Sequence, residues 1–253
     1  MKRVFITGAS SGIGAALARF YAAQGCELGL VGRRADALQK VIDSVQGEYH
    51  QTYVLDVNNR DALHEAAHAF QSIGPVDVVI ASAGISVGTL TEAEEDFEIF
   101  QRIMQTNVMA TVATFEPFIA GMKARSDGRL VAVGSVAGVR GLPGAGAYSA
   151  SKAAVRNYCE SLRVELTNTG IKVITLAPGF IDTPMTAHNP YHMPFLMPVD
   201  AFAERAAKAI ERGDGYRVIP WQMAWVGRML GLVPNFLYDR AAQKRKRKPR
   251  ASE

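Results

Sequence analysis

The sequence is poor in cysteine. Its 253 residues include two cysteines, Cys26 and Cys159, whose positions match no metal-binding or redox motif. Two isolated thiols exclude a disulfide framework and are typical of buried residues in a reducing compartment. The first apolar segment begins at the third or fourth residue, which favours a protein without a signal peptide. We therefore expect a cytoplasmic protein.

The sequence also lacks long hydrophobic runs. No apolar stretch approaches the ~20 residues that a membrane-spanning helix needs. No internal repeat and no interior linker is visible. A hydrophobic content of 48% over 253 residues suits one domain with a full core. We expect at most a peripheral contact with a membrane.

Positive charge is concentrated at one end. Residues 244–250 hold six of the 28 Lys and Arg residues, and without them the chain is slightly acidic. Residues 244–253 are predicted to form a basic tail that is either disordered and solvated or attracted to anionic lipid. Nucleic acid is not an expected partner, because no aromatic residues are interleaved with these charges.

Tyr148 and Lys152 lie four residues apart, and Ser135 precedes Tyr148 by thirteen residues. On a helix, positions i and i+4 share a face, so the ammonium would lie beside the phenol and lower its pKa. A serine hydroxyl from a neighbouring strand end could hold a carbonyl oxygen against that phenol. These groups suit proton transfer to or from a carbonyl or an alcohol. The alternative is an ordinary helix with an exposed Tyr and Lys.

A glycine-rich turn follows the first apolar segment. Residues 4–7 indicate a buried strand, and residues 15–24 have a helical pattern. Between a strand and a helix, glycines let the backbone approach a pyrophosphate, and the helix N-terminus supplies free N–H groups. The sequence therefore predicts that this turn binds a dinucleotide cofactor. The residues of the turn predicted to bind it are Gly8, Ser10, Ser11, Gly12, Ile13 and Gly14.

Further apolar segments alternate with helical patterns, as a doubly wound sheet requires. The fold class predicted is α/β, a single Rossmann-like domain with a parallel sheet of about seven strands and helices on both faces. The segments expected to form the other strands are 28–31, 53–55, 76–80, 130–133, 173–176 and 216–219.

The end of the second expected strand bears on the choice between NAD(H) and NADP(H). An NAD enzyme usually has an acid there to bind the ribose hydroxyls. Here Gly32 occupies that position, and Arg33 and Arg34 follow. A guanidinium can pair with a 2′-phosphate through its planar fork. NADP(H) is therefore favoured over NAD(H), unless both arginines are simply solvated at the start of the next helix.

Taken together, these motifs resemble the short-chain dehydrogenase/reductase family. The pattern T-G-x-x-x-G-x-G from Thr7 to Gly14, Asn107, Ser135 and the Tyr148-x-x-x-Lys152 pair all match. Asp56-Val57 and Pro178-Gly179 match as well. One departure is Ser82, because the family usually has asparagine at this position before Ala83-Gly84.

The resemblance implies NAD(P)-dependent oxidoreduction with Ser135, Tyr148, Lys152 and Asn107 as catalytic residues. Asn107 would hold a water of a proton relay, or else be a satisfied buried amide in a long helix over 96–123. Assembly as a homodimer or homotetramer through the helices around Asn107 and Tyr148 is also implied. The further cofactor contacts implied are Asp56, Val57, Ala83, Gly84, Tyr148, Lys152, Pro178, Gly179, Ile181 and Thr183.

Two segments outside these motifs concern the substrate and possible partners. Within a catalytic domain over 1–220, residues 184–200 resemble the family's variable substrate loop, and their methionines suit an apolar ligand. Residues 221–243 form an apolar extension expected to pack on the core, cover the substrate pocket, join a partner or lie on a membrane surface.

His64-Glu65-Ala66-Ala67-His68 matches a zinc pattern, but no third ligand is evident, so no metal is expected.

The sequence predicts an NADP-dependent oxidoreductase that interconverts a ketone or aldehyde and an alcohol on a small apolar molecule, such as a fatty-acyl, sterol-like or retinoid-like compound. A non-catalytic dinucleotide sensor and a peripheral membrane adaptor that uses the basic tail are the alternatives.

Overall fold

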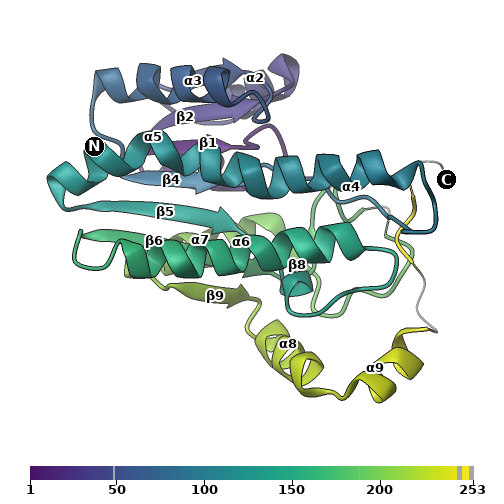
Figure 1. Ribbon diagram of the computed structural model, residues 1–253. Coiled ribbons are helices and arrows are strands. Elements are labelled where there is room, and N and C mark those ends of the chain that lie inside the picture. Colours follow the sequence, from purple (N-terminus) through teal and green to yellow (C-terminus); the bar gives the residue numbers. More distant parts are fainter. Residues whose placement is uncertain (48, 188, 244–246, 251–253) are drawn as a thin grey trace.

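The computed structural model describes residues 1–47, 49–187, 189–243 and 247–250. Strands and helices alternate along most of the chain (Figure 1). In chain order, the elements are β1 (Arg3–Thr7), α1 (Gly12–Ala23), β2 (Glu27–Gly32), α2 (Ala35–Asp43), β3 (Gln51–Val54), α3 (Arg60–Ile73), β4 (Val78–Ala81), α4 (Asp96–Met104), the π-helical turn η1 (Gln105–Met109), α5 (Ala110–Arg125), β5 (Gly128–Val133), the 3-10 turn η2 (Val136–Gly138), α6 (Gly146–Glu165), β6 (Ile171–Pro178), β7 (Ile181–Asp182), β8 (Met197–Pro198), α7 (Val199–Arg212), β9 (Tyr216–Ile219), α8 (Gln222–Leu232) and α9 (Asn235–Ala242).

The main sheet has seven strands in the order β3-β2-β1-β4-β5-β6-β9. Every neighbouring pair is parallel. The strand order reverses between β1 and β4, and in open α/β sheets ligands bind outside the carboxyl ends of the strands at such a point. The predicted α/β class and doubly wound sheet are confirmed.

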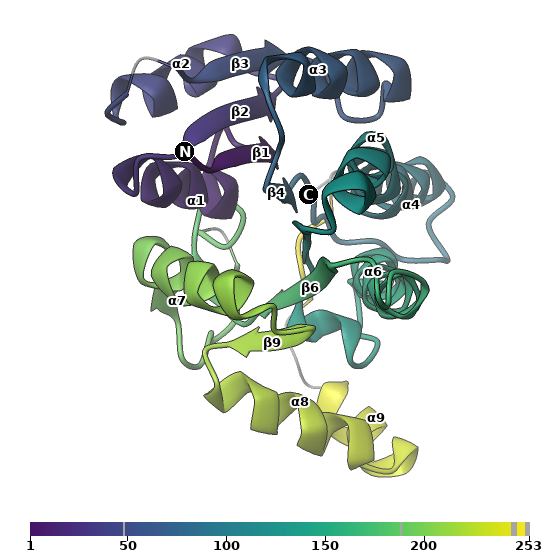
Figure 2. The same cartoon turned by 90° about the vertical axis from the view of Figure 1, so that its left-hand side faces the viewer.

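Helices cover both faces of the sheet (Figure 2). On one face, α1, α2 and α7 pack on a cluster that includes Val4 and Ile6 of β1. On the other face, α3, α5 and α6 pack around Phe5, whose ring lies 5.1 Å from that of Phe118. Successive residues of β1 therefore serve opposite layers, as the two-residue period of a strand requires. Both cysteines are buried in these layers and carry free thiols.

The edge strands differ from the expectation of strands buried on both faces. In β3, partly buried and exposed residues alternate, and Val54 is 56% exposed. Among the described residues, only β2 pairs with β3, so the outer edge of β3 is not covered by a second strand of that part of the chain. At the opposite edge, β9 spans Tyr216–Ile219, the segment that the sequence predicts.

The long helix expected over 96–123 contains a π-helical turn. It consists of α4, η1 and α5, and Asn107 is the central residue of η1. Such turns widen the helix by one residue locally and are frequent at functional sites.

The extension after β9 forms α8 and α9, which project from the sheet near its β9 edge (Figures 1 and 2). Met223 and Gly227 of α8 are buried, whereas Trp225, Met229 and Leu232 are each at least 60% exposed. One side of α8 thus packs on the domain, as one of the expected arrangements has it. Contact of the other side with a partner or a membrane stays a prediction. No helix of the described residues is both long and apolar enough to cross a bilayer.

Part of the basic tail departs from the expected disorder. Residues 247–250 lie against the catalytic domain, where the Gly88 N–H donates to the Pro249 carbonyl at 2.9 Å. Arg250 forms ion pairs with Glu95 and Asp96 at the start of α4. The opposite charges of these side chains hold the segment in place. Residues 244–246 and 251–253 of the tail lie outside the described residues.

Candidate active site

The glycine turn packs tightly between β1 and α1. Gly8 has φ +68°, and a Cβ there would lie 2.7 Å from the backbone nitrogen of Ala83. A Cβ on Gly14 would lie 2.8 Å from the carbonyl carbon of Gly8, and closer still to its oxygen. Only glycine avoids these backbone clashes. The turn can therefore sit directly against the loop that follows β4.

The start of α1 is suited to an anion. Its N-cap residue, Ser11, makes no side-chain capping hydrogen bond, and the first turn has no acidic residue. The first N–H groups of a helix have no intrahelical partner, and the helix dipole favours negative charge there. The glycine turn and this helix end therefore fit the pyrophosphate of a dinucleotide.

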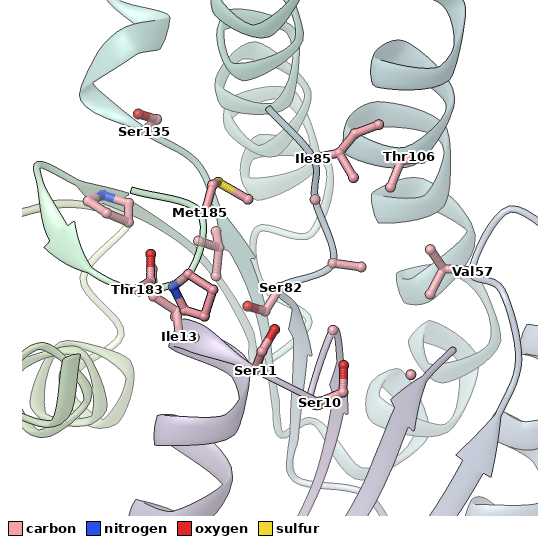
Figure 3. A pocket seen from close by; sticks show the side chains of 18 of the residues that line it. Ser10, Ser11, Ile13, Val57, Ser82, Ile85, Thr106, Ser135, Thr183 and Met185 are labelled. Carbon is pink, nitrogen blue, oxygen red and sulfur yellow. The ribbon is translucent and has the colours of Figure 1, made fainter. Parts of the chain in front are cut away.

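A cavity of about 550 Å³ extends from this turn along the carboxyl ends of the central strands. Figure 3 shows Ser135 and Val57 on opposite sides of the cavity, with Ser10, Ser11 and Met185 between them. Every residue predicted to bind the cofactor lines the cavity except Gly14, which supports the turn from behind. Those lining it are Gly8, Ser10, Ser11, Gly12, Ile13, Arg33, Arg34, Asp56, Val57, Ala83, Gly84, Tyr148, Lys152, Pro178, Gly179, Ile181 and Thr183.

One end of the cavity carries the arginines that follow β2. Arg33 Nη1 lies 3.8 Å from Asp56 Oδ2, and the two side chains are 66% and 43% exposed. No acid occupies the end of β2, because Gly32 is there. The Arg33 guanidinium is therefore exposed at the rim of the cavity with only a long, solvated contact to Asp56.

At the other end, Ser135 follows β5 and begins the turn η2. Its hydroxyl accepts a hydrogen bond from the Ala137 N–H at 3.1 Å, which fixes the orientation of the side chain. Ser135 and Tyr148 both line this cavity. Residues thirteen positions apart thus meet because η2 leads back to α6.

Tyr148 and Lys152 lie on one face of α6. The Lys152 ammonium is 5.7 Å from the centre of the Tyr148 ring and donates to the Val133 carbonyl at 2.8 Å. Lys152 is only 6% exposed. The last residue of β5 therefore anchors the ammonium beside the phenol.

Burial decides the acidity of both groups. It raises the pKa of the Tyr148 phenol, and the neighbouring Ser135 hydroxyl acts in the opposite direction. It lowers the pKa of the Lys152 ammonium to about 8. We expected Lys152 to lower the pKa of the phenol, but the loss of solvent around the ring is the larger effect here.

Asn107 is held by three hydrogen bonds rather than directed into the cavity. Its side-chain oxygen accepts from the Ile85 N–H at 2.8 Å. Its amide donates to the Ile85 carbonyl at 3.0 Å and to Ser151 Oγ at 2.9 Å. Asn107 is 1% exposed and does not line the cavity. This geometry is that of a satisfied buried amide. The Asn107 side chain joins the loop after β4, at Ile85, to Ser151 of α6, the residue before Lys152.

Comparison with known proteins identifies the family to which a chain with this cavity belongs. A family model for short chain dehydrogenases matches residues 2–193, about three quarters of the chain. The chain belongs to the short-chain dehydrogenase/reductase family. The resemblance drawn from the motifs is thereby confirmed, and the protein is an NAD(P)-dependent oxidoreductase.

Two relatives of this short-chain dehydrogenase are similar to it over nearly their whole length. An uncharacterized oxidoreductase from Myxococcus xanthus is 40% identical over 246 residues, which cover 96% of this chain and 97% of the relative. Another uncharacterized oxidoreductase, from Mycobacterium tuberculosis, is 36% identical over 95% of this chain and 97% of its own. These relatives support the reaction class and leave the substrate open.

Two solved structures share the fold of this short-chain dehydrogenase. A short-chain dehydrogenase from Streptomyces avermitilis has a TM-score of 0.78 at 20% identity and covers 95% of each chain. An alcohol dehydrogenase from the archaeon Thermococcus sibiricus, complexed with 5-hydroxy-NADP, has a TM-score of 0.76 at 28% identity. That match covers 87% of this chain and 96% of the archaeal one.

Sequence reasoning missed some residues of the short-chain dehydrogenase cavity. Ile85 and Thr106 line it, and both are chain neighbours of motif residues, which is the signal that could have found them. Thr106 precedes Asn107 in η1 and accepts a hydrogen bond from Asn58 at 3.1 Å. Ser82, where this chain departs from the family, also lines the cavity close to the glycine turn (Figure 3).

Of the two histidines in the zinc-like pattern, His64 contacts α5 and His68 is exposed. His64 Nε2 lies 3.1 Å from the Ala113 carbonyl and 3.3 Å from Glu116. The His68 ring is 6.4 Å from the His64 ring. No cluster of three or more metal-ligating side chains occurs in the part of the chain that the structure describes.

Proposed function

We propose that this enzyme is an NADP-dependent oxidoreductase that interconverts a ketone or aldehyde and an alcohol on an apolar substrate. One observation carries the proposal. At one end of the cavity are Ser135, Tyr148 and Lys152. At the other end is the exposed Arg33, and the residue before it is Gly32 rather than an acid. Proton-transfer groups and a phosphate-binding group are thus separated along a single cavity.

Each side chain has a role that follows from its position. Ser135 donates a hydrogen bond to the substrate carbonyl oxygen, and Tyr148 gives that oxygen a proton in reduction or removes it in oxidation. Lys152, fixed by Val133, keeps a cation beside the phenol and contacts the cofactor ribose. The bound nicotinamide supplies or accepts the hydride. Asn107 holds the loop at Ile85 against α6, and the relay water remains a hypothesis for the same residue.

The segment 184–200 supports an apolar substrate. Met185, Phe195 and Leu196 are 44–50% exposed, although side chains of this kind are usually buried. Met185 also lines the cavity, and Tyr191 contacts Phe180 with ring centres 6.3 Å apart. Met185 thus offers an adaptable apolar surface in the same cavity as the proton-transfer groups.

The proposal is tested by measuring oxidation of NADPH and NADH side by side with a panel of aliphatic and aromatic ketones and aldehydes. We expect turnover with at least one apolar carbonyl compound and a higher kcat/KM for NADPH. Binding of NADPH without turnover across the panel would instead favour the dinucleotide sensor.

Replacing Arg33 by Ser should change the preference between the two cofactors. Charge-assisted hydrogen bonds are worth roughly 1.5–3 kcal/mol, so selectivity for NADPH over NADH should fall about tenfold or more. The measurement is kcat/KM for each cofactor with one carbonyl substrate. Arg205→Ser on the exposed side of α7 is the control. Equal losses with NADPH and NADH would contradict a contact to the 2′-phosphate.

We also propose that two copies assemble through α4, α5 and α6. Phe100 of α4 and Val164 of α6 are 39% and 61% exposed. Phe100 lies beside the first turn of α6 and Val164 is in its last turn, so these exposed apolar side chains suit contacts along the length of α6 in an interface between identical copies.

The double variant Phe100→Asp and Val164→Asp is expected to lower the mass measured by size-exclusion chromatography with light scattering to that of one chain, because it buries two charges in the interface. Leu232→Asp, on the exposed side of α8, should leave the mass unchanged. A wild-type protein of one-chain mass at micromolar concentration would rule the assembly out.

A further inference from the structure

The segment 247–250, which we call the strap, crosses the domain next to the candidate catalytic phenol. It lies near the start of α4 (Figure 1). The Gly88 N–H donates to the Pro249 carbonyl, and Gly88 pairs with Arg250 in a parallel bridge. A Cβ on Gly88 would lie 2.6 Å from the Pro249 oxygen. The strap therefore lies directly on the loop that follows β4.

Charges anchor the far end of the strap. Arg250 Nε donates to Asp96 Oδ2 at 2.8 Å, and its Nη2 donates to Glu95 at 2.5 Å. Asp96 is 4% exposed, and the Leu90 N–H also donates to it at 2.7 Å. A buried carboxylate that receives a guanidinium and a backbone N–H forms a strong, directional contact.

The helices before the strap are fixed as well. The Arg140 guanidinium donates to the Leu230 carbonyl at 2.6 Å and to Asn235 Oδ1 at 2.8 Å. It also lies 4.0 Å from the centre of the Tyr238 ring. Arg140 belongs to the loop that leads into α6, so α8 and α9 are held to the same loop that positions Tyr148.

These contacts place Lys248 over the catalytic end of the site. Its Nζ is 5.9 Å from the centre of the Tyr148 ring and donates to Ser86 Oγ at 2.7 Å. Within residues 1–47, 49–187, 189–243 and 247–250, no carboxylate lies within ion-pairing distance of this ammonium. Burial lowers the pKa of Lys248. A partly desolvated cation without an anionic partner is unfavourable, and an anionic ligand would relieve it.

We propose that Lys248 binds an acidic group of the substrate, so that the enzyme acts on carbonyl compounds, or the corresponding alcohols, that carry a carboxylate or similar anion. The inference rests on the proposed proton transfer at Tyr148. A carbonyl oxygen bonded to the phenol and an anion bonded to the ammonium each lie about 3 Å from their partners. Because both partners belong to one small region, only a short spacer separates the carbonyl from the acid.

The test compares 4-formylbenzoate with the neutral, similarly shaped 4-formylbenzamide in NADPH oxidation. In the wild type, kcat/KM for the carboxylate should exceed that for the amide about tenfold or more, the size expected of one charge-assisted contact. Lys248→Gln should abolish this preference and leave kcat/KM for the amide nearly unchanged. Gly88→Ala, which displaces the strap without altering Lys248, should reduce the preference as well.

Arg247→Gln is the matched control, because it removes one positive charge from the exposed neighbouring residue and should retain the preference. A wild type without a preference, or a Lys248→Gln variant that keeps it, overturns the proposal. Equal losses for both aldehydes in Lys248→Gln also overturn it, because they would indicate an effect on the phenol itself.

A binding measurement separates failure of this inference from failure of the proposed function. The affinities of 4-acetylbenzoate and 4-acetylbenzamide for the wild type and Lys248→Gln are compared by ligand-observed NMR, which needs no turnover. If no carbonyl compound is reduced, the proposed function fails, yet tighter Lys248-dependent binding of the carboxylate still supports the anion site. Equal affinities of the wild type for both compounds overturn it.

Discussion

Replacing Tyr148 by Phe is expected to reduce kcat for carbonyl reduction by about 10²–10⁴-fold, the usual contribution of a positioned general acid or base. The substitution removes one oxygen and leaves the ring, which lies 5.7 Å from the Lys152 ammonium and 5.9 Å from the Lys248 ammonium. The Kd for NADPH should change far less than kcat. Steady-state turnover and a fluorescence titration of NADPH measure the two effects separately.

Tyr158→Phe provides the control for this experiment. Tyr158 lies on the same helix, α6, is also partly buried, and does not line the cavity. Its loss should leave kcat nearly unchanged. Full activity of the Tyr148→Phe protein would show that another group transfers the proton, and the proposed roles of Ser135 and Lys152 would then lose their basis.

Replacing Gly14 by Ala should destabilise the protein and abolish tight binding of the cofactor. The added methyl group would meet the backbone of Gly8, with 2.8 Å to its carbonyl carbon, and backbone atoms cannot move aside as a flexible side chain can. Overpacking of this kind costs roughly 1–3 kcal/mol. The midpoint of urea unfolding and the Kd for NADPH should both worsen, because the displaced turn no longer accommodates the pyrophosphate.

Gly121→Ala is a matched substitution in α5. The nearest atom to a Cβ there is the Gln71 side-chain oxygen at 3.6 Å, an ordinary contact. Alanine also favours helix formation over glycine by about 1 kcal/mol, so this variant should be as stable as the wild type or more so. If the Gly14→Ala protein equals the wild type in stability and NADPH affinity, the turn can accommodate the methyl group. The close packing at Gly14 would then not be required for cofactor binding.

The order of strands and helices could be predicted because each element leaves a local pattern. A buried parallel strand is a short apolar run, and a covering helix repeats its apolar residues every three to four positions. The exposure of β3 could not be predicted in this way. Val54 is exposed because β3 lies at the edge of the sheet, and a single apolar run does not show which strand is at the edge. The π-helical turn around Asn107 also left no local signal.

The tail shows a different limit of sequence reasoning. A run of basic residues is usually solvated, and nothing in the run itself indicates Glu95 and Asp96, more than 150 positions away, as partners of Arg250. The strap over the active site therefore became evident only when these charges were seen side by side.

The amino-acid sequence by itself determined the α/β class, the family and many of the residues that line the cavity, because motif spacing and apolar periodicity are local properties of the chain. Tertiary structure alone decided three further matters: the direction of the Tyr148 pKa, the bracing role of the Asn107 amide, and the position of Lys248 beside the phenol. Burial and contact between residues distant in the chain arise only when the layers pack, so no short segment encodes them.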